Sequence, residues 1–318
     1  MPRLALMAAV LAMSFPLSAQ DSSSKTGSLK LTLAADRTKV QVGEEIQFEA
    51  RIENAGDKDV EIAELTYEER SLSFSVAATF AGGKKKDYPL AVTRPDPQIA
   101  ARLPLPKIVL GPKKSLNVFQ RIPAIAPGKF DIKAKYGSAD AEVSSAPVSI
   151  TVEATTLGGR LAAEVDVADL GTFAIILAPE QSPANVTHFV SLVDRGFYND
   201  MLVHRIVKAN WIQAGCPYGL GIGGPGYAVR AELDKDHKHD RGAVSLAMYD
   251  RSGYAGSQFF ICLSALPTLD GKFTPLGRVE PEDMTRVIEP LSRKETDRNT
   301  DAPRTPVRIK TVTIKVVK

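Results

Sequence analysis

Three segments in the second half of the chain hold the residues whose types and spacing could do chemistry: 203–215, 242–261 and 269–279. The first begins Val-His-Arg-Ile-Val and places Gln213 eight residues after Arg205. Arginine is always protonated and presents a rigid fork of N–H groups, so Arg205 could aim donors at charge that develops in a transition state. The second segment contains Gly-Ser-Gln-Phe-Phe-Ile, whose adjacent phenylalanines point to opposite faces of an expected strand. Together, the arginine and the phenylalanines could place a fixed cation beside an apolar surface.

Three other features of this half look functional, and we interpret them otherwise. The glycine run at 219–224 matches a dinucleotide fingerprint, but a Pro-Gly pair follows it, so no helix can open there to hold a phosphate. His237 and His239 could ligate a metal, yet we interpret them as part of a solvated loop, and we expect no metal and no cofactor. Cys216 and Cys262 form either a disulfide or two buried free thiols, and the sequence leaves both open.

In this order and spacing the three segments resemble the cyclophilins, the peptidyl-prolyl cis-trans isomerases, over residues 159–317. The resemblance implies an eight-stranded closed β-barrel with two capping helices. It also implies that Arg205 is the catalytic arginine, that Gln213 binds the substrate backbone and that Phe260 is the floor of a proline pocket. The remaining substrate-binding positions that it implies are Asn210, Trp211, Gly221, Ala247, Met248, Gln258, Leu269 and Phe273.

The reaction that the resemblance implies is rotation about an X–Pro bond, which a barrier of ~18–20 kcal/mol opposes because the amide is conjugated. In the twisted transition state the proline nitrogen loses conjugation and gains a lone pair. A guanidinium aimed at that nitrogen stabilises the transition state more than the planar ground state, by on the order of 1.5–3 kcal/mol for a charged hydrogen bond. The pocket must also hold the ring and the peptide in register. No metal, nucleotide or covalent intermediate is needed.

The pocket departs from the family pattern at several positions. The family usually has Phe-Met where this chain has Asn210-Trp211, a histidine at Phe273 and a tryptophan at Thr268. Two hypotheses therefore stand. The first is an isomerase that assists the folding of secreted or periplasmic proteins and acts on proline-containing polypeptide clients. The second is a cyclophilin-like module that binds proline-containing segments with little or no turnover.

The elements that must position these residues can be expected from local patterns. Two apolar runs within 160–177 predict a hairpin. Ser182 is a suitable N-cap, Pro183 suits the first helical position, and Gly196 ends the helix. A second helix is expected at 281–291 and a closing strand at 305–317. The barrel domain is expected to occupy residues 157–318.

The first half shows a different pattern. From 28 to 153 apolar residues alternate with polar ones, and turn signals separate the runs, which predicts an immunoglobulin-like β-sandwich of seven or eight strands. The fold class is therefore mainly β. We interpret the lysine run at 84–86 as a solvated loop. The sandwich shows no chemistry and its partner is unknown; it could recruit clients, or bind a glycan or cell wall.

The N-terminus indicates where the protein is located, and the composition limits the kinds of partner it can have. Residues 1–20 have a positive start, an apolar stretch of about a dozen residues and small residues at a cleavage point, which is typical of a signal peptide; a membrane anchor is the alternative. We expect an exported protein, periplasmic or secreted, with no integral membrane segment after signal removal. Lys and Arg number 40 against 37 Asp and Glu, a net charge of +3, which gives no reason to expect nucleic-acid binding.

Overall fold

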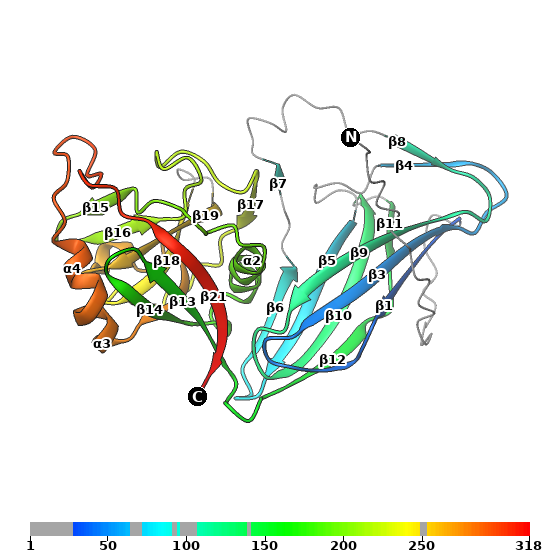
Figure 1. The fold of residues 1–318 in the computed structure, drawn as a ribbon. Coiled ribbons are helices and arrows are strands. Elements are labelled where there is room, and N and C mark those ends of the chain that lie inside the picture. Colours follow the sequence, from blue (N-terminus) through cyan, green and yellow to red (C-terminus); the bar gives the residue numbers. More distant parts are fainter. Residues whose placement is uncertain (1–27, 64–71, 91–93, 96–106, 139–140, 249–252) are drawn as a thin grey trace, which may run out of the picture.

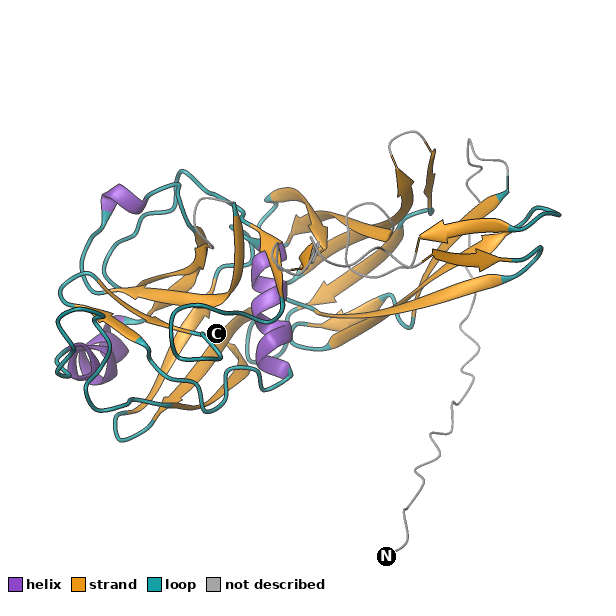
Figure 2. Ribbon diagram, turned by 90° about the horizontal axis from the view of Figure 1, so that it is seen from above, coloured by secondary structure: helices purple, strands orange, loops and turns teal. Residues whose placement is uncertain are grey.

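The structure is a computed structural model that describes residues 28–63, 72–90, 94–95, 107–138, 141–248 and 253–318. Strands dominate these ranges, as expected (Figures 1 and 2). Within them no helix is long and apolar enough to cross a membrane. The expected signal peptide at 1–20 lies outside the described residues.

The N-terminal half forms two main sheets that pack around a shared core. The strands of the first sheet, in spatial order, are β1 (Leu29–Ala35), β3 (Glu45–Asn54) and β9 (Ser115–Pro123). Those of the second are β2 (Lys39–Gln41), β12 (Val148–Glu153), β10 (Gly128–Ser138), β5 (Leu72–Phe80) and β6 (Lys85–Leu90), with β11 (Ala141–Ser144) beside β10. A separate pair joins β4 (Val60–Ala63) and β8 (Lys107–Leu110).

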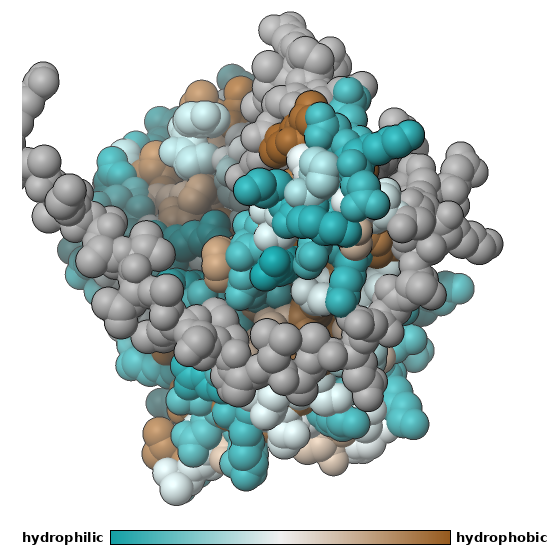
Figure 3. All heavy atoms as spheres, turned by 90° about the vertical axis from the view of Figure 1, so that its right-hand side faces the viewer, coloured by the Kyte–Doolittle hydropathy of each residue, from teal (hydrophilic) through white to brown (hydrophobic). Residues whose placement is uncertain are grey.

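The alternation in the sequence produces this core directly. In β3 every second side chain is buried, and the buried set includes Phe48 and Ile52. Phe80 of β5 and Phe130 of β10 meet edge to face, with ring centroids 5.7 Å apart. Strands β3 and β5 thus turn an apolar face inward and a polar face outward. The end of the molecule farthest from the second half presents mainly hydrophilic side chains (Figure 3).

The second half forms one large curved sheet. Its strand order is β15 (Arg205–Val207), β16 (Trp211–Ala214), β19 (Tyr254–Cys262), β18 (Ala243–Met248), β20 (Thr274–Val279), β14 (Gly171–Leu177), β13 (Arg160–Val167) and β21 (Ile309–Val317). The short strand β17 (Tyr227–Arg230) pairs with β19 on one side and with β7 (Arg94–Pro95) on the other. A single 3-10 turn, η1 (Pro267–Leu269), precedes β20.

The expectation of a closed barrel is wrong, because β15 and β21 are the free ends of this strand order. The segment before β15 and the start of β21 are joined by an isolated bridge, Leu202 with Arg308, and by a hydrogen bond from the N–H of Asp200 to the carbonyl of Lys310 at 3.4 Å, not by a ladder between the two strands. The reason lies at the outer edge of β15, where the N–H of Ile206 donates to the carbonyl of Asp301, 2.8 Å away. A loop therefore occupies the edge at which a closing strand would pair.

Helix α2 (Pro183–Asp194) begins and ends where the sequence predicts. Ser182 precedes it, Pro183 opens it, and Gly196 follows with a φ of +68°, which glycine adopts without strain. The hydroxyl of Ser182 does not cap the helix; it donates to the carbonyl of Pro275. The hydroxyl therefore ties the start of the helix to the strand β20.

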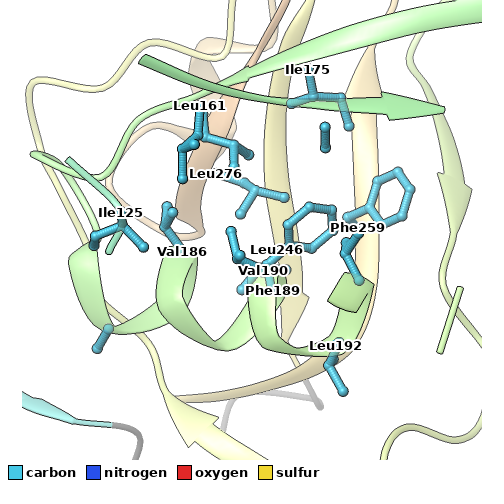
Figure 4. Close-up of a cluster of buried hydrophobic side chains, with 14 of the residues drawn as sticks. Ile125, Leu161, Ile175, Val186, Phe189, Val190, Leu192, Leu246, Phe259 and Leu276 are labelled. Atoms are coloured by element: carbon cyan, nitrogen blue, oxygen red, sulfur yellow. The ribbon is translucent and has the colours of Figure 1, made fainter. Parts of the chain in front are cut away.

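The buried face of α2 fills the inside of the curved sheet. In Figure 4 Phe189 and Val190 point toward Leu246, Phe259 and Leu276. Phe189 and Phe259 meet edge to face at 6.0 Å between centroids. Phe259 is thus a core residue, on the face of β19 opposite to that of Phe260.

The expected second helix at 281–291 is present but irregular. It consists of α3 (Pro281–Asp283), a π-helical turn η2 (Met284–Ile288) and α4 (Glu289–Ser292). Pro290 has no N–H to donate to the carbonyl four residues earlier, so a regular α-helical ladder cannot run through this point. Met284, Val287 and Ile288 are nevertheless buried.

The two halves meet along α2, which contacts β6 and β9. The solvated-loop interpretation of the lysine run is wrong at this contact. Lys85 and Lys86 belong to β6, and Lys86 is half-buried. Its ammonium donates to the carbonyl of Gln181 and lies 3.8 Å from a carboxylate oxygen of Glu232. The lysine bridges the halves.

Candidate active site

Four strands bring the predicted catalytic residues into one row. Arg205 of β15 lies opposite Gln213 of β16, which lies opposite Phe260 of β19, which lies opposite Ser245 of β18. Directly paired residues on neighbouring strands project to the same face of a sheet. Strands β15 and β16 form a tight hairpin, which accounts for the eight-residue spacing in the sequence. The hairpin places the Arg205 guanidinium and the Gln213 amide on the same face of the sheet.

Phe260 is the centre of a small apolar cluster that is distinct from the main core. Its members are Ala243, Phe260 and Cys262, with Trp211, Ala247, Leu266, Leu269 and Phe273 packed around them. The Phe273 ring meets Phe260 edge to face, with centroids 5.2 Å apart. The Trp211 indole is 6.3 Å from the Phe260 ring and tilted by 59°, so it does not lie flat on that ring. The cluster forms an aromatic floor with half-buried walls.

The Arg205 guanidinium is fixed at the edge of this cluster. Its Nε and Nη2 donate to one carboxylate oxygen of Asp301, at 3.2 and 3.1 Å. Its Cζ lies 5.7 Å from the centroid of the Trp211 ring, within the range of a cation–π contact. Both ion-pair partners are partly exposed, at 43% for the Arg205 side chain and 35% for that of Asp301. Trp211 therefore contacts the cation on one side and the aromatic floor on the other.

Two glutamines link the row to the glycine-rich loop. Gln213 Nε2 donates to Gln258 Oε1 at 2.9 Å. Gln258 Nε2 donates to the carbonyls of Gly221 and Gly223 at 2.9 and 3.0 Å. Gln258 therefore orients the Gln213 amide and holds the loop against the site.

Two predicted site residues lie apart from the Phe260 cluster. The Asn210 side chain donates to the backbone carbonyl of Lys208 at 3.3 Å, and the backbone carbonyl of Asn210 accepts from the N–H of Leu263. It stabilises the turn between β15 and β16. Met248, opposite Ala255 at the end of β18, packs against the main core.

The solvated-loop interpretation of His237 and His239 is also wrong, because these side chains are only 8% and 1% exposed. The His239 ring stacks on Phe260, with centroids 5.9 Å apart and planes within 12°. Its Nδ1 donates to Asp270 at 3.2 Å, so its Nε2 accepts from the Ser245 hydroxyl at 3.1 Å. Burial lowers the pKa of His239, so the ring is neutral at pH 7 and supports the underside of Phe260.

Sequence reasoning did not assign roles to His239, Asp270 or Asp301. A signal for the first existed, because Ser245 interrupts an apolar strand and a buried hydroxyl needs a partner. No comparable signal marks Asp301. In the described part of the chain no group of three or more His, Cys, Asp or Glu side chains could hold a metal ion.

Cys216 and Cys262 are both buried free thiols, which decides between the two alternatives that the sequence left open. Burial raises the pKa of Cys262 to about 12, so it is a protonated apolar side chain within the Phe260 cluster.

Comparisons with known proteins match the second half of the chain to one family. Residues 162–314 match the family described as cyclophilin type peptidyl-prolyl cis-trans isomerase/CLD. A peptidyl-prolyl cis-trans isomerase of Helicobacter pylori (strain ATCC 700392 / 26695) is 38% identical over 124 residues, which is 39% of this chain and 76% of the relative. Peptidyl-prolyl cis-trans isomerase B of Bacillus subtilis (strain 168) is 40% identical over 104 residues, 32% of this chain and 72% of the relative.

A solved Cryptosporidium parvum cyclophilin, crystallised with the dipeptide Ala-Pro, is 27% identical, with a TM-score of 0.45 over 49% of this chain and 99% of that one. From the sequence matches, the chain belongs to the cyclophilin-type peptidyl-prolyl cis-trans isomerase family. The prediction of an enzyme of this type is confirmed.

Proposed function

We propose that Arg205 is the catalytic residue and that the Phe260 cluster is the proline pocket of an exported isomerase. One observation carries this proposal: Arg205, Gln213 and Phe260 are direct neighbours across three strands. The enzyme assists the folding of secreted or periplasmic proteins, and its substrates are proline-containing segments of unfolded polypeptides.

The geometry suggests how the row acts. A guanidinium has five N–H groups. Asp301 uses two of those on Arg205, and no described residue accepts from the other three. When the proline ring rests on Phe260, a free N–H can donate to the proline nitrogen as it becomes pyramidal. The side-chain nitrogen of Gln213 donates to Gln258, and this hydrogen bond orients the Gln213 amide. Its side-chain carbonyl oxygen can then accept a hydrogen bond from a substrate N–H. The transition state is stabilised by donors fixed before the substrate arrives.

A protease-coupled assay on an Ala-Pro peptide tests this role of Arg205. The Arg205→Ala variant should lose at least tenfold in kcat/KM, since a charged hydrogen bond contributes on the order of 1.5–3 kcal/mol. Arg241→Ala is the matched control, because that arginine is similarly exposed and pairs with Glu289 away from the site. Equal turnover by the Arg205→Ala variant and the native protein would falsify the assignment.

A second function is favoured by the Arg205–Asp301 ion pair, which engages the guanidinium before any substrate binds. In this alternative the pocket binds proline-containing segments but turns them over slowly or not at all. Peptide binding without turnover, even at high protein concentration, would select it.

The N-terminal half supplies the remaining parts of the proposal. Its two sheets and alternating core support the immunoglobulin-like β-sandwich at 28–153, whose role we propose is to recruit clients. Export depends on residues 1–20. Mass spectrometry of the mature N-terminus, after expression in a bacterial host, tests the leader: cleavage within a few residues of Gln20 is expected, and an intact Met1 in the soluble fraction contradicts it.

A further inference from the structure

The glycine-rich loop beside the site carries three exposed apolar side chains that the proposed mechanism does not use. Tyr218, Leu220 and Ile222 are 71%, 73% and 70% exposed, which is unusual for side chains of this size. Glycines separate them, and Gly221 between the last two has a φ of +75°, a conformation that glycine adopts without strain. The loop thus displays three apolar side chains close together in the sequence.

This loop is held to the catalytic row. The carbonyls of Gly221 and Gly223 accept hydrogen bonds from the side-chain nitrogen of Gln258. The side-chain oxygen of Gln258 accepts a hydrogen bond from Gln213. Gly221 also lies over the buried ring of His204, where an added Cβ would be 3.6 Å from that ring. The apolar patch is therefore continuous with the substrate surface, and its distance from the pocket is set by one glutamine side chain.

Strand geometry gives the approximate distance between the apolar patch and the Phe260 pocket. Gln258 and Phe260 are two residues apart on β19, on the same face, so their Cα atoms are about 7 Å apart. The glutamine side chain and its hydrogen bond extend the reach to roughly 10–15 Å from the aromatic floor. An extended polypeptide advances about 3.3 Å per residue, so the patch lies roughly three to five residues from a proline held on Phe260.

We propose that Tyr218, Leu220 and Ile222 form a subsite for one large apolar side chain of the client, three to five residues from the target proline and on one side of it. This inference rests on the proposed function, because it takes the Phe260 cluster as the proline pocket. Folded proteins bury such side chains and unfolded ones expose them. The subsite therefore selects extended segments in which a proline has an aliphatic or aromatic neighbour.

Alanine-rich peptides with one central Ala-Pro test this subsite in the full chain. A single leucine is moved through the five positions before and the five positions after the proline, and kcat/KM is measured by NMR exchange. In the native protein a leucine three to five residues from the proline, on one side only, should raise kcat/KM about three- to tenfold over the all-alanine peptide. A gain that is equal on both sides, or absent at every position, would overturn the proposal.

Two variants assign the gain to the loop. In Tyr218→Thr/Leu220→Thr/Ile222→Thr the ratio of leucine to all-alanine turnover should fall to about one, and in Leu220→Thr it should fall part of the way. Val109→Thr changes an exposed apolar side chain elsewhere, 63% exposed, and should keep the native ratio. An unchanged ratio in the triple variant contradicts the inference, and the urea midpoint of each variant reports whether it folds.

The same peptides separate this inference from the proposed function. If no peptide is turned over, the catalytic role of Arg205 fails, and dissociation constants measured by NMR titration replace the rates. A leucine at the favoured positions should then tighten binding to the native protein but not to the triple variant. Equal dissociation constants for all the peptides would overturn the subsite.

Discussion

Replacing Asp301 by asparagine removes the charge that holds the Arg205 guanidinium and leaves the shape of the loop. Asp301 has a φ of +59°, a left-handed conformation that asparagine adopts about as readily as aspartate. The backbone carbonyl of residue 301 can still accept a hydrogen bond from the N–H of Ile206 at the edge of β15. The substitution therefore tests the carboxylate rather than the backbone.

The size of the effect follows from exposure. With side chains 43% and 35% exposed, the ion pair is screened by water, and such pairs contribute about 0.2–1 kcal/mol. A freed arginine also regains part of its ~2 kcal/mol of rotamer entropy, although the contact with Trp211 limits this. We expect a loss of about 1 kcal/mol of transition-state stabilisation, which is about fivefold in kcat, with little change in KM.

Kinetics on the Ala-Pro peptide, in a double-mutant cycle, measure this coupling. Asp301→Asn should lower kcat in the native background but have no further effect in Arg205→Ala, because the carboxylate acts through the guanidinium. Glu289→Gln, which breaks the exposed pair with Arg241, should leave kcat unchanged. An increase in kcat for Asp301→Asn would refute the reasoning, since it would mean that the carboxylate draws the cation away from the substrate.

Three further substitutions or conditions test other contacts. His239→Ala removes the support beneath Phe260 and leaves a buried hydroxyl unpaired, so it should lower the free energy of unfolding by about 2 kcal/mol in urea titrations and also lower kcat; an unchanged urea midpoint contradicts this. Burial lowers the pKa of His188 and of His204 to about 4, so the unfolded chain binds protons first as the pH falls from 6.5 to 4. The free energy of unfolding should therefore decrease over that window, by on the order of 3 kcal/mol per histidine, and the decrease should be smaller in a His188→Gln variant; parallel profiles would exclude this contribution. Lys86→Ala leaves the buried carboxylate of Glu232 without its cation, so scanning calorimetry should show a lower unfolding temperature, whereas Lys85→Ala on the exposed face of the same strand should have little effect.

The sequence was sufficient where the determining pattern is local or repeated. Alternation predicted strands such as β3 and β10, and Ser182, Pro183 and Gly196 predicted the limits of α2. The resemblance named Arg205, Gln213 and Phe260 as one site, and the structure pairs them across three neighbouring strands.

The sequence was insufficient where a contact joins distant segments. Asp301 lies 96 residues after Arg205 in a loop, and no periodicity connects them. His239 and Lys86 stand among charged neighbours, which favours exposure. The rings of Phe260 and Phe273 nevertheless bury His239, and Lys86 is half-buried against the carboxylate of Glu232. The open edge at β15 follows from the loop around Asp301 and has no signature of its own.

Helix α2 has consequences for any attempt to separate the halves. Nearly all of its residues from Pro183 to Val193 are buried, because one side packs inside the curved sheet while the other faces β6, β9 and Ile125 (Figure 4). A fragment that began after residue 157 would leave that second side uncovered in water. Such a truncation should be prone to aggregate, and the isomerase half of this chain is best handled with its N-terminal neighbour still attached.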